Sequence, residues 1–286
     1  MTVQFITAQD LAQHLAQDLT QHRDWLILDA SYYLKGGVEK AEESFKQAAI
    51  PGAKFWNINA CADPHSQLPH MLAPELIFAH FLTGSQWQAG QPICIYDQQG
   101  LFSAPRLAWE FLKREVGADI YLLQGGLPAW QNAGLDTVPG AVVVEPKTPD
   151  PSLWWQDAFV ASYAINEVFD ELQFDPSVAA QIVDARPPGR FAGTEPEPRA
   201  GLRSGHIPGS INLPYTSVIK DGKFADDFDL RGLNLAMPII TTCGSGITAA
   251  GLALALEGRG AEHVVVYDGS WTQWGDPCSM TPVITD

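Results

Sequence analysis

The sequence is short of positive charge, and it contains no long hydrophobic run. Lysine and arginine together number 17 among 286 residues, against 33 aspartates and glutamates, so the formal net charge is −16. A protein this acidic does not attract nucleic acid or anionic membranes non-specifically. No run of about 18 apolar residues is available to cross a bilayer, and the N-terminal stretch lacks the basic and apolar regions of a signal peptide. We therefore expect a cytoplasmic protein with no nucleic-acid or membrane partner.

Cysteine is scarce as well, and its placement argues against two kinds of site. The four cysteines are Cys61, Cys94, Cys243 and Cys278, and no two of them form a CxxC pair. A chain of this length needs no disulfide framework, so we expect a reducing compartment. The histidines show no HExxH spacing, which is typical of one class of zinc site. We therefore predict no metal and no cofactor.

The sequence does contain a long internal repeat. An apolar strand that ends at Asp29 corresponds to one that ends at Asp184, and "AAIPGAKFWNI" corresponds to "GHIPGSINLPY". Further along, "PICIYDQQGLFSAPRLAWEFL" pairs with "PIITTCGSGITAAGLALALEG", so that Asp97 falls opposite Cys243. A repeat of this length indicates two duplicated domains rather than a solenoid of short units.

Short apolar strands alternate with helical stretches in each half. The expected strands are Trp25–Leu28, Ile93–Tyr96, Ile120–Leu123, Ile182–Val183, Pro238–Thr242 and His263–Tyr267, and the expected helices include Ala8–Leu19, Ala104–Glu115 and Thr248–Glu257. This order predicts an α/β fold in which each domain is a mostly parallel sheet flanked by helices, with functional groups at the carboxyl ends of the strands. We place the first domain at residues 1–139, a proline-rich linker at 140–157 and the second domain at 158–286.

The stretch "TTCGSGITAAG" places Cys243 at such a carboxyl end, before a glycine-rich turn and a helix. A free cysteine is usually a small buried hydrophobic residue, but the end of a strand is an exposed location. The letters that follow also spell the G-x-G-x-x-A of a dinucleotide loop. Too little chain remains after Asp268 to complete a dinucleotide fold, which disfavours that interpretation.

Two enzymatic interpretations use Cys243 as a nucleophile. A cysteine phosphatase requires an arginine six positions after the cysteine, where this chain has Ala249, so we reject that class. In general, successive backbone N–H groups and the N-terminus of a helix favour a thiolate over a thiol. The sequence therefore predicts a reactive thiolate at Cys243.

The loop "CGSGITA" resembles the active-site loop of two-domain rhodanese-type sulfurtransferases, most of all that of the 3-mercaptopyruvate sulfurtransferases. The similarity covers nearly the whole chain and includes "GRFAGTEPEPRAGLRSGHIPGSINLPY", "YDGSWTQWG", "QGLFSAPR" and "HML". The resemblance implies two tandem rhodanese-like domains and the transfer of sulfane sulfur. Cys243 would take sulfur from 3-mercaptopyruvate as a persulfide, with release of pyruvate, and pass it to cyanide or to a thiol such as thioredoxin.

The resemblance also implies a set of site residues. Arg190 and Arg199 would hold the carboxylate and ketone of the substrate, which suits the planar guanidinium group. The hydroxyl of Ser245 would donate to the developing oxyanion or relay a proton, together with His70 and Asp63. The implied substrate-binding set is Arg190, Arg199, Gly244, Gly246, Ile247 and Thr248.

Other interpretations stay open at this point. The two arginines would also fit solvated ion pairs with Glu195 or Glu197. A thiosulfate:cyanide sulfurtransferase would carry basic residues after the cysteine, where this chain has neutral Gly244 and Ser245. A non-catalytic rhodanese module would carry sulfur or bind a partner, although the intact cysteine loop disfavours it. The first domain has Asp97 at the cysteine position, so we expect it to be inert.

Overall fold

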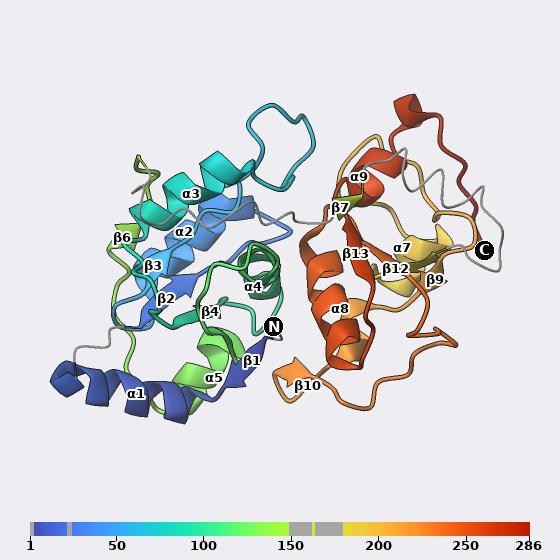
Figure 1. Ribbon diagram of the computed structural model, residues 1–286. Coiled ribbons are helices and arrows are strands. Elements are labelled where there is room, and N and C mark those ends of the chain that lie inside the picture. The colour runs from blue at the N-terminus through green and yellow to red at the C-terminus, as the bar shows by residue number, and fades with distance from the viewer. Residues whose placement is uncertain (1–2, 22–24, 149–161, 164–179) are drawn as a thin grey trace. The chain divides into compact units, whose positions relative to one another are not determined.

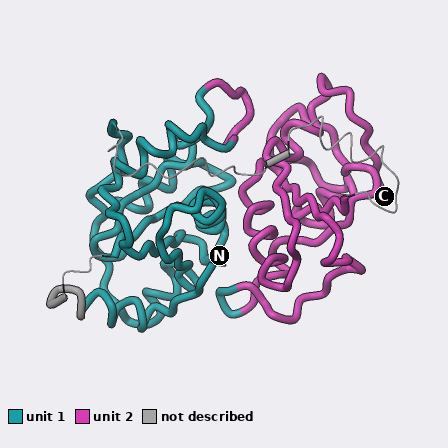
Figure 2. Tube along the Cα trace, viewed as in Figure 1, with its two compact units in different colours: residues 1–64, 72–160, 221–223 teal, residues 65–71, 161–220, 224–286 magenta. Residues whose placement is uncertain are grey.

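The computed structural model describes residues 3–21, 25–148, 162–163 and 180–286, which fall into two compact units. The first unit comprises residues 1–64, 72–160 and 221–223, and the second comprises residues 65–71, 161–220 and 224–286 (Figure 2). The loop of residues 65–71 therefore belongs to the second unit, although it lies in the first half of the sequence. Among the described residues, no helix is long and apolar enough to cross a bilayer.

A six-stranded parallel sheet forms the centre of the first unit (Figure 1), in the order β1-β5-β4-β2-β3-β6. Its strands are β1 (Gln4–Ile6), β2 (Leu26–Asp29), β3 (Lys54–Phe55), β4 (Ile93–Tyr96), β5 (Ile120–Leu123) and β6 (Val142–Val143). Its helices are α1 (Ala8–Gln21), α2 (Gly37–Gln47), α3 (Glu75–Gly84), α4 (Ala104–Lys113) and α5 (Gly126–Asn132). Every residue of β2 and β4 is buried, as expected for parallel strands that are covered on both faces.

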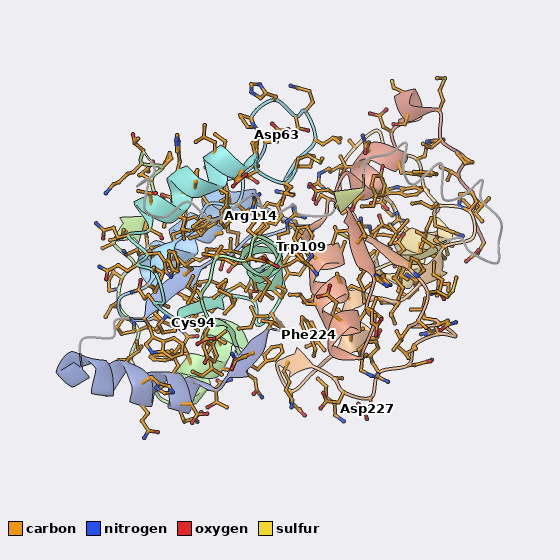
Figure 3. The ribbon with its side chains drawn as sticks, in the orientation of Figure 1. Asp63, Cys94, Trp109, Arg114, Phe224 and Asp227 are labelled. Carbon is orange, nitrogen blue, oxygen red and sulfur yellow. The ribbon has the colours of Figure 1, made fainter. Side chains whose placement is uncertain are left out.

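Apolar side chains of the helices pack on this sheet in two clusters. One cluster contains Phe45 of α2 and Cys94 of β4. Figure 3 labels Cys94. In the other, the ring of Trp56 lies 5.7 Å from that of Phe78 in α3 and 5.6 Å from that of Phe111 in α4, measured between centroids. The burial of these side chains stabilises the packing of the helices on the sheet. The connecting loops follow the carboxyl ends of the strands.

The second unit contains a five-stranded parallel sheet in the order β7-β13-β12-β8-β9. Its strands are β7 (Ser162–Tyr163), β8 (Gln181–Asp184), β9 (Ile211–Asn212), β12 (Ile239–Thr242) and β13 (Val264–Tyr267), and a short hairpin consists of β10 (Ile219–Lys220) and β11 (Lys223–Phe224). The helices are α7 (Pro188–Ala192), η2 (Tyr215–Val218), α8 (Ile247–Gly258), α9 (Ser270–Trp274) and η3 (Pro277–Ser279). A Cβ atom at Gly251 of α8 would lie 2.6 Å from the hydroxyl oxygen of Tyr215. Glycine therefore allows Tyr215 to pack against the helix backbone.

These two sheets confirm the predicted fold class, and most of the expected elements lie within one or two residues of the observed ones. Strands Ile93–Tyr96 and Ile120–Leu123 have the predicted bounds. The domain and linker boundaries stay a prediction, and part of the predicted linker, residues 140–157, is the short strand β6. There β6 pairs in parallel with β3, because two extended valines satisfy the outer hydrogen bonds of that strand. The linker residues 149–157 lie outside the described residues.

Candidate active site

Cys243 follows β12 directly and begins the loop that leads into α8. Figure 1 labels both elements. The loop ends at Gly246, whose φ of 83° is a left-handed conformation that glycine adopts without steric strain. Cys243 is only 3% exposed, so the exposed location expected for it from the sequence is wrong: the loop and the start of α8 bury the end of the strand. Ile247 and Thr248 open the helix, and the first N–H groups of a helix have no partner within it. The loop and the helix start together therefore offer the backbone donors that hold an anion.

The start of α9 holds the Cys243 loop in shape. The backbone N–H of Trp271 donates to the carbonyl of Cys243 at 2.9 Å, and that of Thr272 donates to the carbonyl of Gly244 at 2.9 Å. The Thr272 hydroxyl donates to the same Gly244 oxygen at 2.6 Å. Because a trans peptide points its C=O and its N–H in opposite directions, these bonds turn the N–H groups of Gly244 and Ser245 away from α9.

Ser270 ties the two ends of the same loop together. Its hydroxyl oxygen accepts the backbone N–H of Cys243 at 3.2 Å and that of Gly246 at 3.1 Å, and its hydroxyl donates to the carbonyl of Tyr267 at 2.8 Å. Sequence reasoning missed Ser270 and Thr272. The internal repeat held a signal for them, because the first half has Gly126 and Pro128 at the matching positions.

Both predicted arginines lie over Gly244. A Cβ atom at that position would be 3.1 Å from Nη2 of Arg190 and 4.0 Å from Nη1 of Arg199. Arg190 belongs to the short helix α7, and Arg199 follows in the next segment of the chain. The absence of a side chain at Gly244 therefore allows two guanidinium groups to approach the cysteine loop closely.

A series of buried ion pairs connects Arg190 with the end of β8. Asp184 at the end of β8 accepts from Arg186, with 2.6 Å between Oδ2 and Nη2, and Arg186 donates from Nη1 to Glu197 at 2.8 Å. The guanidinium of Arg186 also lies 4.1 Å from the ring centroid of Trp271. Burial alone lowers the pKa of Arg186, but the carboxylates of Asp184 and Glu197 raise it, and the net result is a raised pKa.

Arg190 is the second arginine bound by Glu197. Its Nη2 lies 2.5 Å from Oε2 of Glu197, and the two side chains are 13% and 3% exposed. The sequence left open an ion pair of this arginine with Glu195 or Glu197, and Arg190 does pair with Glu197. The pair is nevertheless largely buried rather than solvated.

Arg199 connects Ser245 with His70, which lies in the loop of residues 65–71. Its Nη2 is 3.4 Å from Oγ of Ser245 and 3.4 Å from Nε2 of His70. A guanidinium group can only donate, so His70 can take part in this contact as an acceptor through Nε2. Within the described part of the chain, no hydrogen bond joins Ser245 directly to His70. The structure thus brings Ser245, His70 and Arg199 together.

Asp63 belongs to the first unit, in the long loop between β3 and α3 (Figure 3). His70 and Ser245 belong to the second unit. The relay from Asp63 through His70 to Ser245 stays a prediction.

The first unit contains a matching loop after β4, and a carboxylate fills it. Asp97 accepts four backbone N–H groups at 2.9–3.1 Å, from Gln99, Leu101, Ser103 and Ala104. Asp97 is fully buried. The Asp97 side chain thus fills a nest of four backbone donors, at the position that Cys243 holds in the second unit.

Comparison with known proteins places these two units in one family. A family model described as "Rhodanese-like domain" matches residues 7–133 and 166–276. The 3-mercaptopyruvate sulfurtransferase of Escherichia coli (strain K12) is 37% identical over 281 residues, which are 96% of this chain and 95% of that protein. The Homo sapiens protein of the same name is 38% identical over 259 residues, with 87% and 84% covered.

Solved structures agree with this comparison. The crystal structure of SseA from Escherichia coli, described as a 3-mercaptopyruvate sulfotransferase with the rhodanese fold, has a TM-score of 0.73 at 33% identity and covers 94% of this chain and 99% of its own. A sulfur transferase subunit of yeast mitochondrial complex I has a TM-score of 0.77 at 31% identity, with 99% of both chains covered. The chain belongs to the rhodanese family, in its two-domain branch of 3-mercaptopyruvate sulfurtransferases, which confirms the family and the enzyme class predicted from the sequence.

Proposed function

We propose that the protein takes sulfur from 3-mercaptopyruvate as a persulfide on Cys243 and passes it to a thiol or to cyanide. One observation carries this proposal: Arg190 and Arg199 lie over Gly244, beside a cysteine that follows a strand directly and begins the turn into helix α8. A keto acid with a terminal thiol fits such a site, because its carboxylate is remote from the sulfur that reacts.

The proposed reaction is a displacement at sulfur. The Cys243 thiolate attacks the thiol sulfur of 3-mercaptopyruvate and forms an S–S bond, while the bond between that sulfur and C3 breaks. The electron pair of that bond passes into the enolate of pyruvate, and the thiol proton ends on C3. Arg199 and the Ser245 hydroxyl, 3.4 Å apart, are positioned to stabilise the enolate oxygen as it forms. The products are pyruvate and an anionic persulfide on Cys243.

The acceptor and the compartment are part of the same proposal. A thiol acceptor such as thioredoxin would attack the outer sulfur and restore the Cys243 thiolate. A reducing cytoplasm suits this chemistry, and the four cysteines of the chain are all free. His70 and Asp63 would complete the proton relay to Ser245.

The test compares two sulfur donors with cyanide as the common acceptor. Pyruvate release from 3-mercaptopyruvate and sulfite release from thiosulfate would be followed in separate assays, each with thiocyanate formation as the second readout. We expect a kcat/KM for 3-mercaptopyruvate at least about tenfold above that for thiosulfate, about 1.4 kcal/mol in transition-state terms. Equal use of both donors would contradict the proposed specificity, and absence of turnover with either would contradict the proposed activity.

A further inference from the structure

The Glu197 carboxylate binds two arginines, Arg186 and Arg190. Its negative charge therefore lowers the net positive charge beside the cysteine loop. Its Oε1 accepts from Arg186 at 2.8 Å, and its Oε2 accepts from Nε and Nη2 of Arg190 at 3.1 and 2.5 Å. The carboxylate is only 3% exposed, so water screens these contacts little. Arg190 therefore meets the cysteine loop as one half of an ion pair.

The charges beside the loop can be counted from these contacts. Asp184 and Glu197 supply two negative charges, and Arg186 and Arg190 supply two positive charges. These four paired side chains therefore have no net charge. Arg199 contacts Ser245 and His70. Among the residues that the structure describes, Arg199 lies within ion-pair distance of no carboxylate. These five side chains thus carry one net positive charge beside Gly244, before the charge of the Cys243 thiolate is counted.

We propose that Glu197 is a specificity-determining residue that limits the site to one net positive charge and thereby selects donors with a single negative charge. This inference rests on the proposed function and names the residue that sets its substrate class. A monoanionic keto acid matches the one free charge of Arg199. A dianion such as thiosulfate leaves one negative charge unmatched beside the Cys243 thiolate, and like charges repel more strongly where water is excluded.

The direct test is Glu197→Gln, which keeps the size of the side chain and one acceptor oxygen but removes the charge. With thiosulfate, the Cys243 thiolate attacks the outer sulfur, and the S–S bond of the donor breaks with its electron pair on sulfite. We expect the ratio of kcat/KM for thiosulfate to that for 3-mercaptopyruvate to rise at least about tenfold in this variant. A merely structural role would lower both values together and leave the ratio unchanged, which would overturn the proposal.

The chain offers a matched control two residues away. Glu195 is exposed, and it forms no ion pair within the described residues. Glu195→Gln makes the same change in net charge and is expected to leave the donor ratio as it is. An equal rise in both variants would assign the effect to the overall charge of the protein and would contradict a special role of Glu197.

A second readout does not depend on which donor the enzyme uses. Iodoacetate and iodoacetamide both alkylate cysteine, but only iodoacetate is negatively charged, so the ratio of their rates at Cys243 reports the local potential. Glu197→Gln should raise the iodoacetate rate relative to the iodoacetamide rate by about threefold or more. Arg190→Gln, which removes a positive charge instead, should lower that ratio and keeps the test decisive if the Glu197 variant does not fold. An unchanged ratio in both variants would overturn the inference, whereas a changed ratio without turnover of 3-mercaptopyruvate would refute the proposed function alone.

Discussion

In the first unit, β4 ends at Asp97 and a turn through Gly100 leads into α4, while in the second unit β12 ends at Cys243 and a turn through Gly246 leads into α8. The two glycines have φ values of 84° and 83°. In both loops the first carbonyl accepts a backbone N–H from the next helix along the chain, at 2.9 Å in each case, from Leu127 to Asp97 and from Trp271 to Cys243. The backbones are alike, and the side chain at the strand end differs.

The difference teaches that a nest of this kind stabilises whatever anion fills it and does not by itself define an enzyme. In the first unit the anion is a carboxylate that is part of the chain, and it uses four N–H donors. In the second unit the corresponding position is Cys243, the nucleophile of the proposed reaction. Arg190 and Arg199 approach Gly244, and Thr272 fixes the carbonyl of that residue.

The largest effect is expected from Cys243→Ser, which should abolish turnover and leave the fold intact, because serine cannot form a persulfide. Mass spectrometry of the wild type after incubation with donor should show one added sulfur, on Cys243. The double variant Cys243→Ser, Asp97→Cys tests the comparison itself and should stay inactive. Sulfur found on Cys61, Cys94 or Cys278 together with surviving activity would contradict this assignment.

Asp97→Ala should leave the nest of the first unit without its anion, with several buried N–H groups unsatisfied. Unsatisfied buried donors cost about 1–3 kcal/mol each before relaxation, so we expect a loss of about 4 kcal/mol in the free energy of unfolding. Denaturant unfolding measures this loss. Asp97→Asn keeps an acceptor and should lose less, and a loss below about 1 kcal/mol for the alanine variant would show that the carboxylate is not needed.

The strand-end acids Asp29 and Asp184 provide a comparison through pH. Asp184 pairs with Arg186, whereas Asp29 accepts from the neutral groups of Ser31, Gln98 and Tyr96. Burial raises the pKa of Asp29 from 3.8 to about 6. The folded state therefore binds this proton more tightly than the unfolded state, so its contribution to stability rises as pH falls from about 6 to 4, by up to about 3 kcal/mol.

Asp29→Asn removes the titrating group and should remove this contribution. The measurement is the difference in unfolding free energy between the wild type and the variant at several pH values, which cancels the other carboxylates. Relative to the variant, the wild type should gain stability as the solution is acidified. A difference that does not depend on pH between 4 and 7 would contradict the pKa of Asp29.

Arg190→Ala and Arg199→Ala test the two cations that the second unit places over Gly244. Loss of a charge-assisted pair with the substrate carboxylate costs about 1.5–3 kcal/mol, or roughly a ten- to hundredfold loss in kcat/KM. The loss should be greater for Arg199, because Glu197 already shares the charge of Arg190. Lysine should restore part of the activity, since it supplies the charge without the planar fork. Wild-type kcat/KM in both alanine variants would place the substrate elsewhere.

The smallest effect is expected from Thr272→Val, which removes the hydroxyl bond to the Gly244 carbonyl and keeps the backbone bond. We expect a loss of about 1 kcal/mol in transition-state stabilisation, seen as a fall in kcat of about fivefold with little change in KM. Thr272→Ser keeps the hydroxyl and should retain activity. Similar losses in both variants would assign the effect to packing of the methyl group.

Sequence patterns predicted the parallel sheets and the position of Cys243, because both depend on local periodicity and on the repeat. They did not reveal that Glu197 is buried, since "EPEPR" has the composition of a solvated loop. Its burial depends on Arg186 and Asp184, which tertiary packing brings to it. The place of His70 in the second unit is equally non-local, because 129 residues separate it from its contact Arg199.

The Asp97 carboxylate can also be regarded as a ligand that is covalently tethered and therefore always bound. A ligand that binds only the folded state stabilises it, so the first unit holds this stabilisation permanently. In the proposed reaction the second unit gains the equivalent only while Cys243 carries the persulfide anion, and it loses it each time the acceptor removes the sulfur. The two halves of one chain would then differ in their thermodynamics during turnover: one of constant stability, and one whose melting temperature rises and falls with its sulfur load.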